Sequence, residues 1–202
     1  MMIWLCAAVF GALGVTSTAE CPAVALYFAR GTFERRGLGQ VGVALRDELR
    51  RRRANIEVFP IDYPAKLVNP LFHISVQQGA RNAAVQIRDM VKKCPDVKLV
   101  LAGYSQGAAV IHEIELDDLA SSIIAIIVFG DPYRLSLPPK WPIGASRGVI
   151  CKICRSGDPI CLNGLNPKSH LDYELDTPEA ANFIIDIIEQ SKPSRKYPIC
   201  DL

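Results

Sequence analysis

The sequence predicts an α/β protein in which a mostly parallel, five-stranded sheet lies between two layers of helices. Short apolar segments alternate along the chain with segments of helical periodicity. The strand-like segments are continuously apolar, which is typical of parallel strands buried on both faces. The chain has 202 residues, of which 50% are hydrophobic and 22% are charged, so it can form one hydrophobic core and differs from a disordered chain.

Five short apolar segments are expected to form the strands of this sheet. The fourth, Ile123–Phe129, is rich in β-branched residues and has no charged residue, so we place it in the middle of the sheet. The five segments, in chain order, are residues 24–29, 56–59, 98–102, 123–129 and 149–153.

Four helices are expected between and after the strands. Apolar residues recur every three or four positions in each of them, which gives each helix one apolar face. In the last helix, Thr177 is expected as the N-cap residue and Pro178 as the first helical residue. The four segments are residues 41–53, 76–91, 108–116 and 177–188.

The N-terminal nineteen residues have the pattern of a secretory signal peptide. They carry no charged side chain, residues 3–10 form an apolar core, and Ser17-Thr18-Ala19 supplies small residues for cleavage before Glu20. The alternative is a buried N-terminal strand or helix. No later segment contains 18 uninterrupted apolar residues, so no transmembrane segment is expected. We expect residues 1–19 to be removed and the mature chain to be secreted.

Charge and cysteine content exclude several classes of protein. The net charge of +2 is too small for the broad basic surface that nucleic acid usually requires. Six cysteines remain once Cys6 is removed with the signal peptide, and an even number in an exported chain predicts three disulfides. Cys151 and Cys154 form a Cys-x-x-Cys motif, but no second such motif or histidine pair accompanies it, so no metal is expected.

The segment Gly103-Tyr104-Ser105-Gln106-Gly107 follows the third expected strand directly. It matches Gly-x-Ser-x-Gly, the nucleophile elbow in which a serine lies on a sharp turn between a strand and a helix. The two glycines relieve the crowding on either side of that turn and leave the serine hydroxyl exposed at the helix N-terminus. The alternative is a coincidental turn. We predict that Ser105 is a nucleophile.

The histidine that would act as the base is found by elimination. In elbow architectures the partners follow the nucleophile in the order Ser, Asp, His, and His73 precedes Ser105. His112 is the seventh residue after Ser105 along the same helix, roughly 10 Å away and beyond hydrogen-bond reach. His170 lies in the polar, turn-rich stretch 163–173, which we expect to be a loop that returns over Ser105. His170 is therefore the predicted base.

Two aspartates between Ser105 and His170 follow expected strands. Asp131 follows the fourth strand, and Asp158 follows the fifth in a segment flanked by Cys154 and Cys161. A bridge between these cysteines would hold Asp158 rigidly, which suits an acid that orients an imidazole. We prefer Asp158, and Asp131 remains the alternative, with a turn-forming role as its simpler interpretation.

These segments together resemble the cutinase family of secreted serine esterases. The resemblance implies a compact α/β-hydrolase fold without a large lid, one catalytic domain over residues 20–202, and the triad Ser105, Asp158 and His170. It also implies an oxyanion hole formed by the Gln106 backbone amide and by Thr32. The matching segments are Ala29-Arg30-Gly31-Thr32-Phe33-Glu34, Gly103-Tyr104-Ser105-Gln106-Gly107-Ala108, Cys154-x-x-Gly157-Asp158-x-x-Cys161 and His170-Leu171-x-Tyr173.

The resemblance also assigns two disulfides. By the family pattern, Cys21 pairs with Cys94 and Cys154 pairs with Cys161. Subtraction leaves Cys151 and Cys200. We assign these two to each other, with two free thiols as the alternative.

The predicted activity is hydrolysis of carboxylic esters through an acyl-enzyme, by a monomer without a metal or organic cofactor. The expected substrates are cutin-like polyesters or short- to medium-chain acyl esters. The alternatives are an acetylxylan esterase of the same architecture and a secreted binding or host-signalling protein that does not need catalysis. Apolar residues expected to flank the serine favour an acyl chain, although ordinary packing beneath loops would also explain them: Leu67, Val68, Leu71, Phe72, Leu162 and Leu165.

Overall fold

The computed structural model describes residues 21–52, 54–67, 70–135, 141–142 and 150–189. Within these ranges five strands form one sheet in the order β2-β1-β3-β4-β5, and every neighbouring pair is parallel. The predicted sheet is confirmed, and it is wholly rather than mostly parallel. The strands are β1 (Val24–Ala29), β2 (Ile56–Pro60), β3 (Lys98–Tyr104), β4 (Ile123–Phe129) and β5 (Ile150–Ile153).

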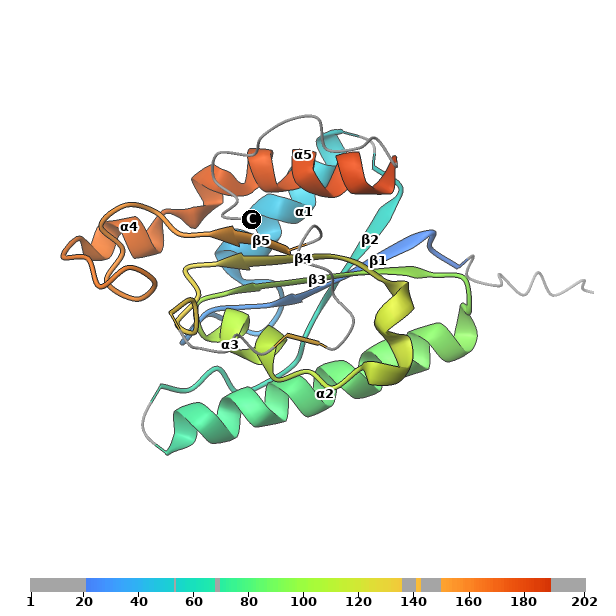
Figure 1. Ribbon diagram of the computed structural model, residues 1–202, viewed down its shortest axis with the longest axis horizontal. Coiled ribbons are helices and arrows are strands. Elements are labelled where there is room, and N and C mark those ends of the chain that lie inside the picture. The colour runs from blue at the N-terminus through green and yellow to red at the C-terminus, as the bar shows by residue number, and fades with distance from the viewer. Residues whose placement is uncertain (1–20, 53, 68–69, 136–140, 143–149, 190–202) are drawn as a thin grey trace, which may run out of the picture.

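Helices cover both faces of the sheet and complete the predicted three layers (Figure 1). Helices α1 and α5 lie on one face, and α2 and α3 lie on the other. The short helix α4 projects at the edge where the strands end. The helices are α1 (Gly39–Arg51), α2 (Leu71–Lys93), α3 (Gln106–His112), α4 (Pro167–Leu171) and α5 (Thr177–Ile188).

Two hydrophobic clusters separate these layers. Successive side chains of a strand point to opposite faces of the sheet. Tyr27 and Leu101 are paired in register and belong to the cluster beneath α2 and α3. Leu26 and Val100 are also paired and belong to the cluster beneath α1 and α5. Burial on both faces explains why the strand segments are continuously apolar.

Several element boundaries differ from the prediction, among them the end of α3 and the start of α5. Helix α3 ends at His112 rather than at residue 116. Glu113 and Glu115 follow it, and acidic side chains are unfavourable near the negative end of the helix dipole. Helix α5 begins at Thr177 itself, with Asp176 before it, so Thr177 is not the N-cap residue. Its hydroxyl group donates a hydrogen bond to the carbonyl oxygen of Glu174.

The stretch around His170 is not the loop that we expected. Residues 167–171 form helix α4, which begins after Asn166 with Pro167 at its first turn. The Asn166 side chain accepts a hydrogen bond from the amide of Lys168. An asparagine cap followed by proline is a common helix start, so the sequence carried a signal for this helix.

The Cys21–Cys94 disulfide joins the segment before β1 to the end of α2. The expected partner of Cys151, Cys200, lies outside the described residues, as do the proposed signal peptide and Val149. Among the helices within the described ranges, none is long and apolar enough to cross a membrane.

Candidate active site

Ser105 lies on a sharp turn between β3 and α3. Its backbone has φ 54° and ψ −118°, a conformation that a residue other than glycine rarely adopts. A Cβ atom added at Gly103 would lie 2.3 Å from the carbonyl oxygen of Gly107, and one at Gly107 would lie 2.0 Å from that of Ala29. The turn therefore requires both glycines, as the Gly-x-Ser-x-Gly pattern predicts.

Three side chains from separate segments form a hydrogen-bonded chain at this turn. The Oγ atom of Ser105 lies 2.9 Å from Nε2 of His170. The Nδ1 atom of the same ring lies 2.8 Å from Oδ2 of Asp158. The His170 side chain is 13% exposed, whereas the Asp158 side chain is fully buried. Ser105 itself is partly exposed, so the nucleophile can meet a substrate from solvent.

The Asp158 carboxylate is satisfied at both oxygens. Oδ1 accepts hydrogen bonds from the amides of Ile160 and Cys161, at 2.6 and 3.3 Å. Oδ2 accepts from His170 and from the hydroxyl group of Tyr173, the latter at 2.6 Å. Burial raises the pKa of this carboxyl group, but the hydrogen bonds from His170, Tyr173 and Ile160 outweigh it, so the pKa lies below its ordinary value. Asp158 is therefore a carboxylate at neutral pH.

The loop that carries Asp158 is closed on itself. A disulfide joins Cys154 to Cys161 across it. The carbonyl oxygen of Asp158 accepts hydrogen bonds from the amides of Leu162 and Gly164, at 3.2 and 2.9 Å. The two sulfur atoms lie close to the Asp158 carboxylate, but they are bonded to each other and are not thiolate ligands for a metal.

The alternative acid, Asp131, is paired with a different histidine. Its Oδ2 atom lies 2.8 Å from Nε2 of His112, and both side chains are buried. The His112 ring stacks on Trp141, with centroids 4.0 Å apart. His73 is exposed on α2, where its ring contacts Phe72 edge-on. Of the three histidines, His170 is the one that the structure brings to Ser105.

Residues 65 and 66 contact both segments that carry the expected oxyanion donors. The buried side chain of Gln106 donates to the carbonyl oxygen of Lys66 at 2.7 Å and accepts from the hydroxyl group of Ser75 at 3.0 Å. The amide of Phe33, next to Thr32, donates to the carbonyl oxygen of Ala65 at 2.9 Å. The helix start at Gln106 and the Thr32 loop are therefore fixed to the same part of the chain.

Glu34 fixes the conformation of the Thr32 loop, a role that the sequence analysis did not assign. Its two carboxylate oxygens accept hydrogen bonds from the amides of Gly31 and Gln40, both at 2.6 Å. A Cβ atom at Gly39 would lie 2.3 Å from a Glu34 oxygen. A side chain at position 39 would therefore displace the Glu34 carboxylate, and the φ of 68° at Gly39 also favours glycine there.

Apolar side chains are exposed on the segments that surround Ser105. Four of the expected lining residues are exposed, Leu165 to 97%, whereas Phe72 is partly buried and packs against the core. Val68 lies outside the described residues. Other exposed apolar side chains on these segments were not anticipated. The exposed expected residues are Leu67, Leu71, Leu162 and Leu165, and the additional ones are Phe33, Ile74, Ile160 and Leu171.

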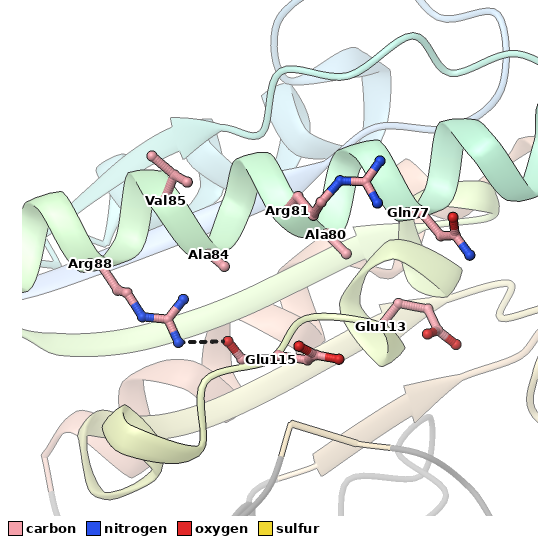
Figure 2. Close-up of a pocket in the computed structure, with 8 residues that line it drawn as sticks. All are labelled: Gln77, Ala80, Arg81, Ala84, Val85, Arg88, Glu113 and Glu115. Atoms are coloured by element: carbon pink, nitrogen blue, oxygen red, sulfur yellow. Dashed lines mark hydrogen bonds between the residues drawn. The ribbon is translucent and has the colours of Figure 1, made fainter.

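A hollow of about 560 Å³ lies away from this site, between α2 and the segment after α3 (Figure 2). In Figure 2 the guanidinium group of Arg88 points across it and donates to the backbone oxygen of Glu115. Its lining mixes small or apolar side chains of α2 with polar and charged ones of α2 and of the segment after α3, and it includes no member of the Ser105 site. The lining residues are Gln77, Ala80, Arg81, Ala84, Val85, Arg88, Glu113 and Glu115.

Comparison with known proteins gives the family. A model of the cutinase family matches residues 20–188. Cutinase 4 of Emericella nidulans is 34% identical over 176 residues, which cover 85% of this chain and 74% of that protein. Carboxylesterase Culp1 of Mycobacterium tuberculosis is 34% identical over 179 residues, covering 81% and 80%.

A solved structure agrees with these matches. The Trichoderma reesei cutinase in complex with a phosphonate inhibitor superposes with a TM-score of 0.71 at 32% identity, over 83% of this chain and 77% of that one. The fold and the serine elbow described above are thus accompanied by similarity over most of the chain. The chain belongs to the cutinase family and is a hydrolase of the cutinase and carboxylesterase class.

Proposed function

We propose that this protein hydrolyses cutin-like polyesters or short- to medium-chain acyl esters through an acyl-enzyme on Ser105. The observation that carries the proposal is the chain of hydrogen bonds from Ser105 through His170 to the buried carboxylate of Asp158. A serine hydroxyl group is a weak nucleophile unless a neighbouring base removes its proton. The geometry supplies such a base, together with the carboxylate that orients it.

Each group in this proposal has a defined part in the reaction. Ser105 attacks the ester carbonyl while His170 takes its proton, and His170 then gives that proton to the leaving alcohol. Asp158 holds the imidazole tautomer and stabilises the imidazolium form. The Gln106 amide and Thr32 stabilise the oxyanion, an interaction whose loss typically lowers kcat by about a hundred- to a thousand-fold. Water then attacks the acyl-enzyme, with His170 as the base, and releases the acid.

The exposed apolar side chains around Ser105 support an acyl substrate over a sugar. Large apolar residues that cluster on exposed segments mark a surface that binds apolar material. Leu162 and Leu165 follow Asp158 along the chain and Leu171 follows His170, whereas Leu67 follows Lys66, which contacts Gln106, and Leu71 begins α2. An acyl chain bound at Ser105 would cover part of this apolar surface. An acetyl group would cover very little of it.

We also propose that the protein acts outside the cell after cleavage before Glu20. The Cys21–Cys94 and Cys154–Cys161 disulfides support this, because such bonds persist in oxidising compartments. Expression of the full chain in a secreting host, with mass measurement of the protein in the medium, tests this proposal. Recovery of a chain that still begins at Met1 would contradict it.

Replacing the nucleophile tests the reaction. We expect Ser105→Ala to abolish esterase activity and to leave the unfolding temperature nearly unchanged, because the hydroxyl group contributes little to packing. In the wild type, an organophosphate should label Ser105 stoichiometrically, as measured by mass spectrometry. Ser122→Ala, in the 3-10 helix Asp117–Ser122 just before β4, is the control and should retain full activity. Labelling at another residue of an active preparation would refute the assignment.

A chain-length profile tests the substrate. We expect p-nitrophenyl butyrate to hexanoate to be hydrolysed with higher kcat/KM than the acetate, and polyester film to be degraded faster than acetylated xylan. The apolar surface gives a longer chain more area to bury, worth roughly 0.8 kcal/mol for each methylene group. Preference for the acetate together with rapid deacetylation of xylan would favour the acetylxylan esterase alternative.

A further inference from the structure

Tyr173 is a buried tyrosine beside the site to which neither the elbow pattern nor the triad assigns a role. It lies three residues after His170, at the start of the short 3-10 helix Tyr173–Asp176. Its relative exposure is 0%, and it is the largest of the fully buried side chains. A hydroxyl group buried to this degree must find hydrogen-bond partners, so the partners of this one are informative.

The Tyr173 hydroxyl group has one donor partner and one acceptor partner within 3.1 Å. The backbone amide of Arg155 donates to the hydroxyl oxygen at 3.1 Å. The hydroxyl group in turn donates to Oδ2 of Asp158 at 2.6 Å. Cys161 Sγ lies 3.4 Å away, but a disulfide sulfur is a weak acceptor and carries no proton. The single phenolic proton is therefore directed at the carboxylate.

The Tyr173 ring is fixed by its neighbours. Its centroid lies 5.7 Å from that of Tyr104 and 6.1 Å from that of Phe129. The His170 ring meets it edge-on at 6.0 Å. A Cβ atom added at Gly130 would lie 2.7 Å from Tyr173 Cε2 and 2.9 Å from His170 Cε1, so both rings pack against the same glycine. The tyrosine thus has one place relative to the imidazole and the carboxylate.

We infer that Tyr173 is a positioning residue of this site, an inference that rests on the proposed function. Its hydroxyl group holds Oδ2 of Asp158 in the orientation in which this oxygen accepts the Nδ1 hydrogen bond of His170. The same oxygen serves both donors, so the tyrosine fixes the carboxylate and also takes up part of its charge. Without this hydroxyl group the carboxylate loses one hydrogen bond that fixes its orientation, and its negative charge acts more strongly on the imidazole.

Burial favours the neutral phenol that this role needs. Burial and the neighbouring Asp158 carboxylate raise the pKa of Tyr173, so the hydroxyl group keeps its proton throughout the working range. Other titratable groups also surround the Asp158–His170 pair, and any pH effect must be separated from theirs. They are Tyr104 at the end of β3, Arg155 paired with Asp176, and Asp172, Glu34 and Glu174 on the adjoining segments.

The test is Tyr173→Phe, measured as kcat, KM and the pH profile of kcat/KM with p-nitrophenyl butyrate. A hydrogen bond to a charged group is worth enough to change a rate about ten-fold, so we expect kcat to fall about ten-fold while KM stays unchanged. The acid limb of the profile should move to higher pH. Without the Tyr173 hydrogen bond, the negative charge of Asp158 acts more strongly on His170 and stabilises its protonated form.

Two tyrosines serve as matched controls. Tyr27 is buried in the sheet, and its hydroxyl group donates to the carbonyl oxygen of Gln86, so Tyr27→Phe should match the wild type in rate and profile. The hydroxyl group of Tyr104 donates to the carbonyl oxygen of His170 at 2.6 Å, so it touches the same loop but not the carboxylate. Tyr104→Phe removes a contact of that loop but none of the carboxylate, so the acid limb of its profile should stay in place.

A second variant decides the question if Tyr173→Phe does not fold. Site-specific 3-fluorotyrosine at position 173 keeps the ring and the hydroxyl group and makes the phenol a stronger donor, so the acid limb should move to lower pH. If Tyr173→Phe folds, an acid limb that stays in place, as in Tyr104→Phe, overturns the inference. If it does not fold, an unmoved acid limb in the 3-fluorotyrosine variant overturns it. The proposed function fails separately, if Ser105→Ala remains active, and the inference then falls with it.

Discussion

His170 and His112 each place a ring nitrogen 2.8 Å from a carboxylate oxygen, of Asp158 and Asp131 respectively. Both aspartates follow strands of the sheet, Asp131 after β4 and Asp158 after β5. The surroundings of the two pairs differ. The His170 side chain is 13% exposed, and its second nitrogen lies 2.9 Å from Ser105. The His112 side chain is 1% exposed, and its ring stacks on Trp141.

The difference shows that a histidine–aspartate pair does not by itself make a catalytic site. A buried polar pair can brace two segments by satisfying each other's hydrogen bonds, and His112 with Asp131 joins the end of α3 to the segment after β4 in this way. The pair becomes an acid–base device when the other ring nitrogen faces a nucleophile that solvent can reach. The predictions below test whether the two pairs divide catalysis and stability between them.

The largest expected effect is the loss of catalysis when the His170–Asp158 pair is disturbed. Asp158→Asn should lower kcat about ten-thousand-fold, because the amide favours the wrong imidazole tautomer. Asp131→Asn should leave kcat within about two-fold and lower the free energy of unfolding by about 1–3 kcal/mol, the usual cost of disturbing a buried hydrogen bond. Steady-state kinetics and urea unfolding of both variants measure these effects. If Asp131→Asn were the inactive variant, the roles of the two pairs would be reversed.

The two described disulfides should also differ in whether they mainly support catalysis or stability, with smaller effects than those of the aspartates. Cys154 and Cys161 are only 7 residues apart, so their bridge contributes less entropy than the roughly 3 kcal/mol of a fifteen-residue loop. Its main effect should be to position Asp158, and a shift of about 1 Å at a site can cost about a hundred-fold in rate. We expect Cys154→Ser/Cys161→Ser to lower kcat by about that factor, with a modest loss of stability.

The control is the bridge that lies far from the site. Cys21 and Cys94 are 73 residues apart, so their bridge constrains a long loop of the unfolded chain. Cys21→Ser/Cys94→Ser should lower the urea midpoint and change kcat little at temperatures where the protein stays folded. A larger loss of kcat in this variant than in Cys154→Ser/Cys161→Ser would contradict the division.

The sequence contained the site but not the contacts that hold it. The strand pattern, the elbow and the elimination of His73 and His112 required only local spacing and chain order, and the structure brings the expected Ser105, His170 and Asp158 together. The hydrogen bonds of Gln106 to Lys66 and Ser75 join residues 40 and 31 positions apart, and no local pattern predicts them. Tyr173 was visible only as part of a family motif.

The smallest expected effect concerns how the Asp158 carboxyl group, paired with His170, makes the stability of the protein depend on pH. The hydrogen bonds that Asp158 receives hold its folded-state pKa below the ordinary value of about 3.9. Between these two pKa values the unfolded chain binds more protons than the folded one, so stability rises with pH. The contribution of Asp158 is therefore fully present above the ordinary value and is lost as the pH falls through the folded-state value. The asparagine variant has no carboxyl group at this position and lacks this contribution at every pH.

The measurement is the difference in urea unfolding free energy between the wild type and Asp158→Asn, at pH 5 and at pH 3. Other carboxyl groups titrate in both proteins and cancel in the difference, provided that they do not interact with position 158. The stability advantage of the wild type should be smaller at pH 3, because the unfolded wild-type chain binds a proton at Asp158 as the pH falls, whereas the folded state resists that proton. An advantage that is the same at both pH values would mean that the hydrogen bonds to Asp158 do not favour the ionised form. The His170–Asp158 pair would then differ from the His112–Asp131 pair only in that its histidine contacts Ser105.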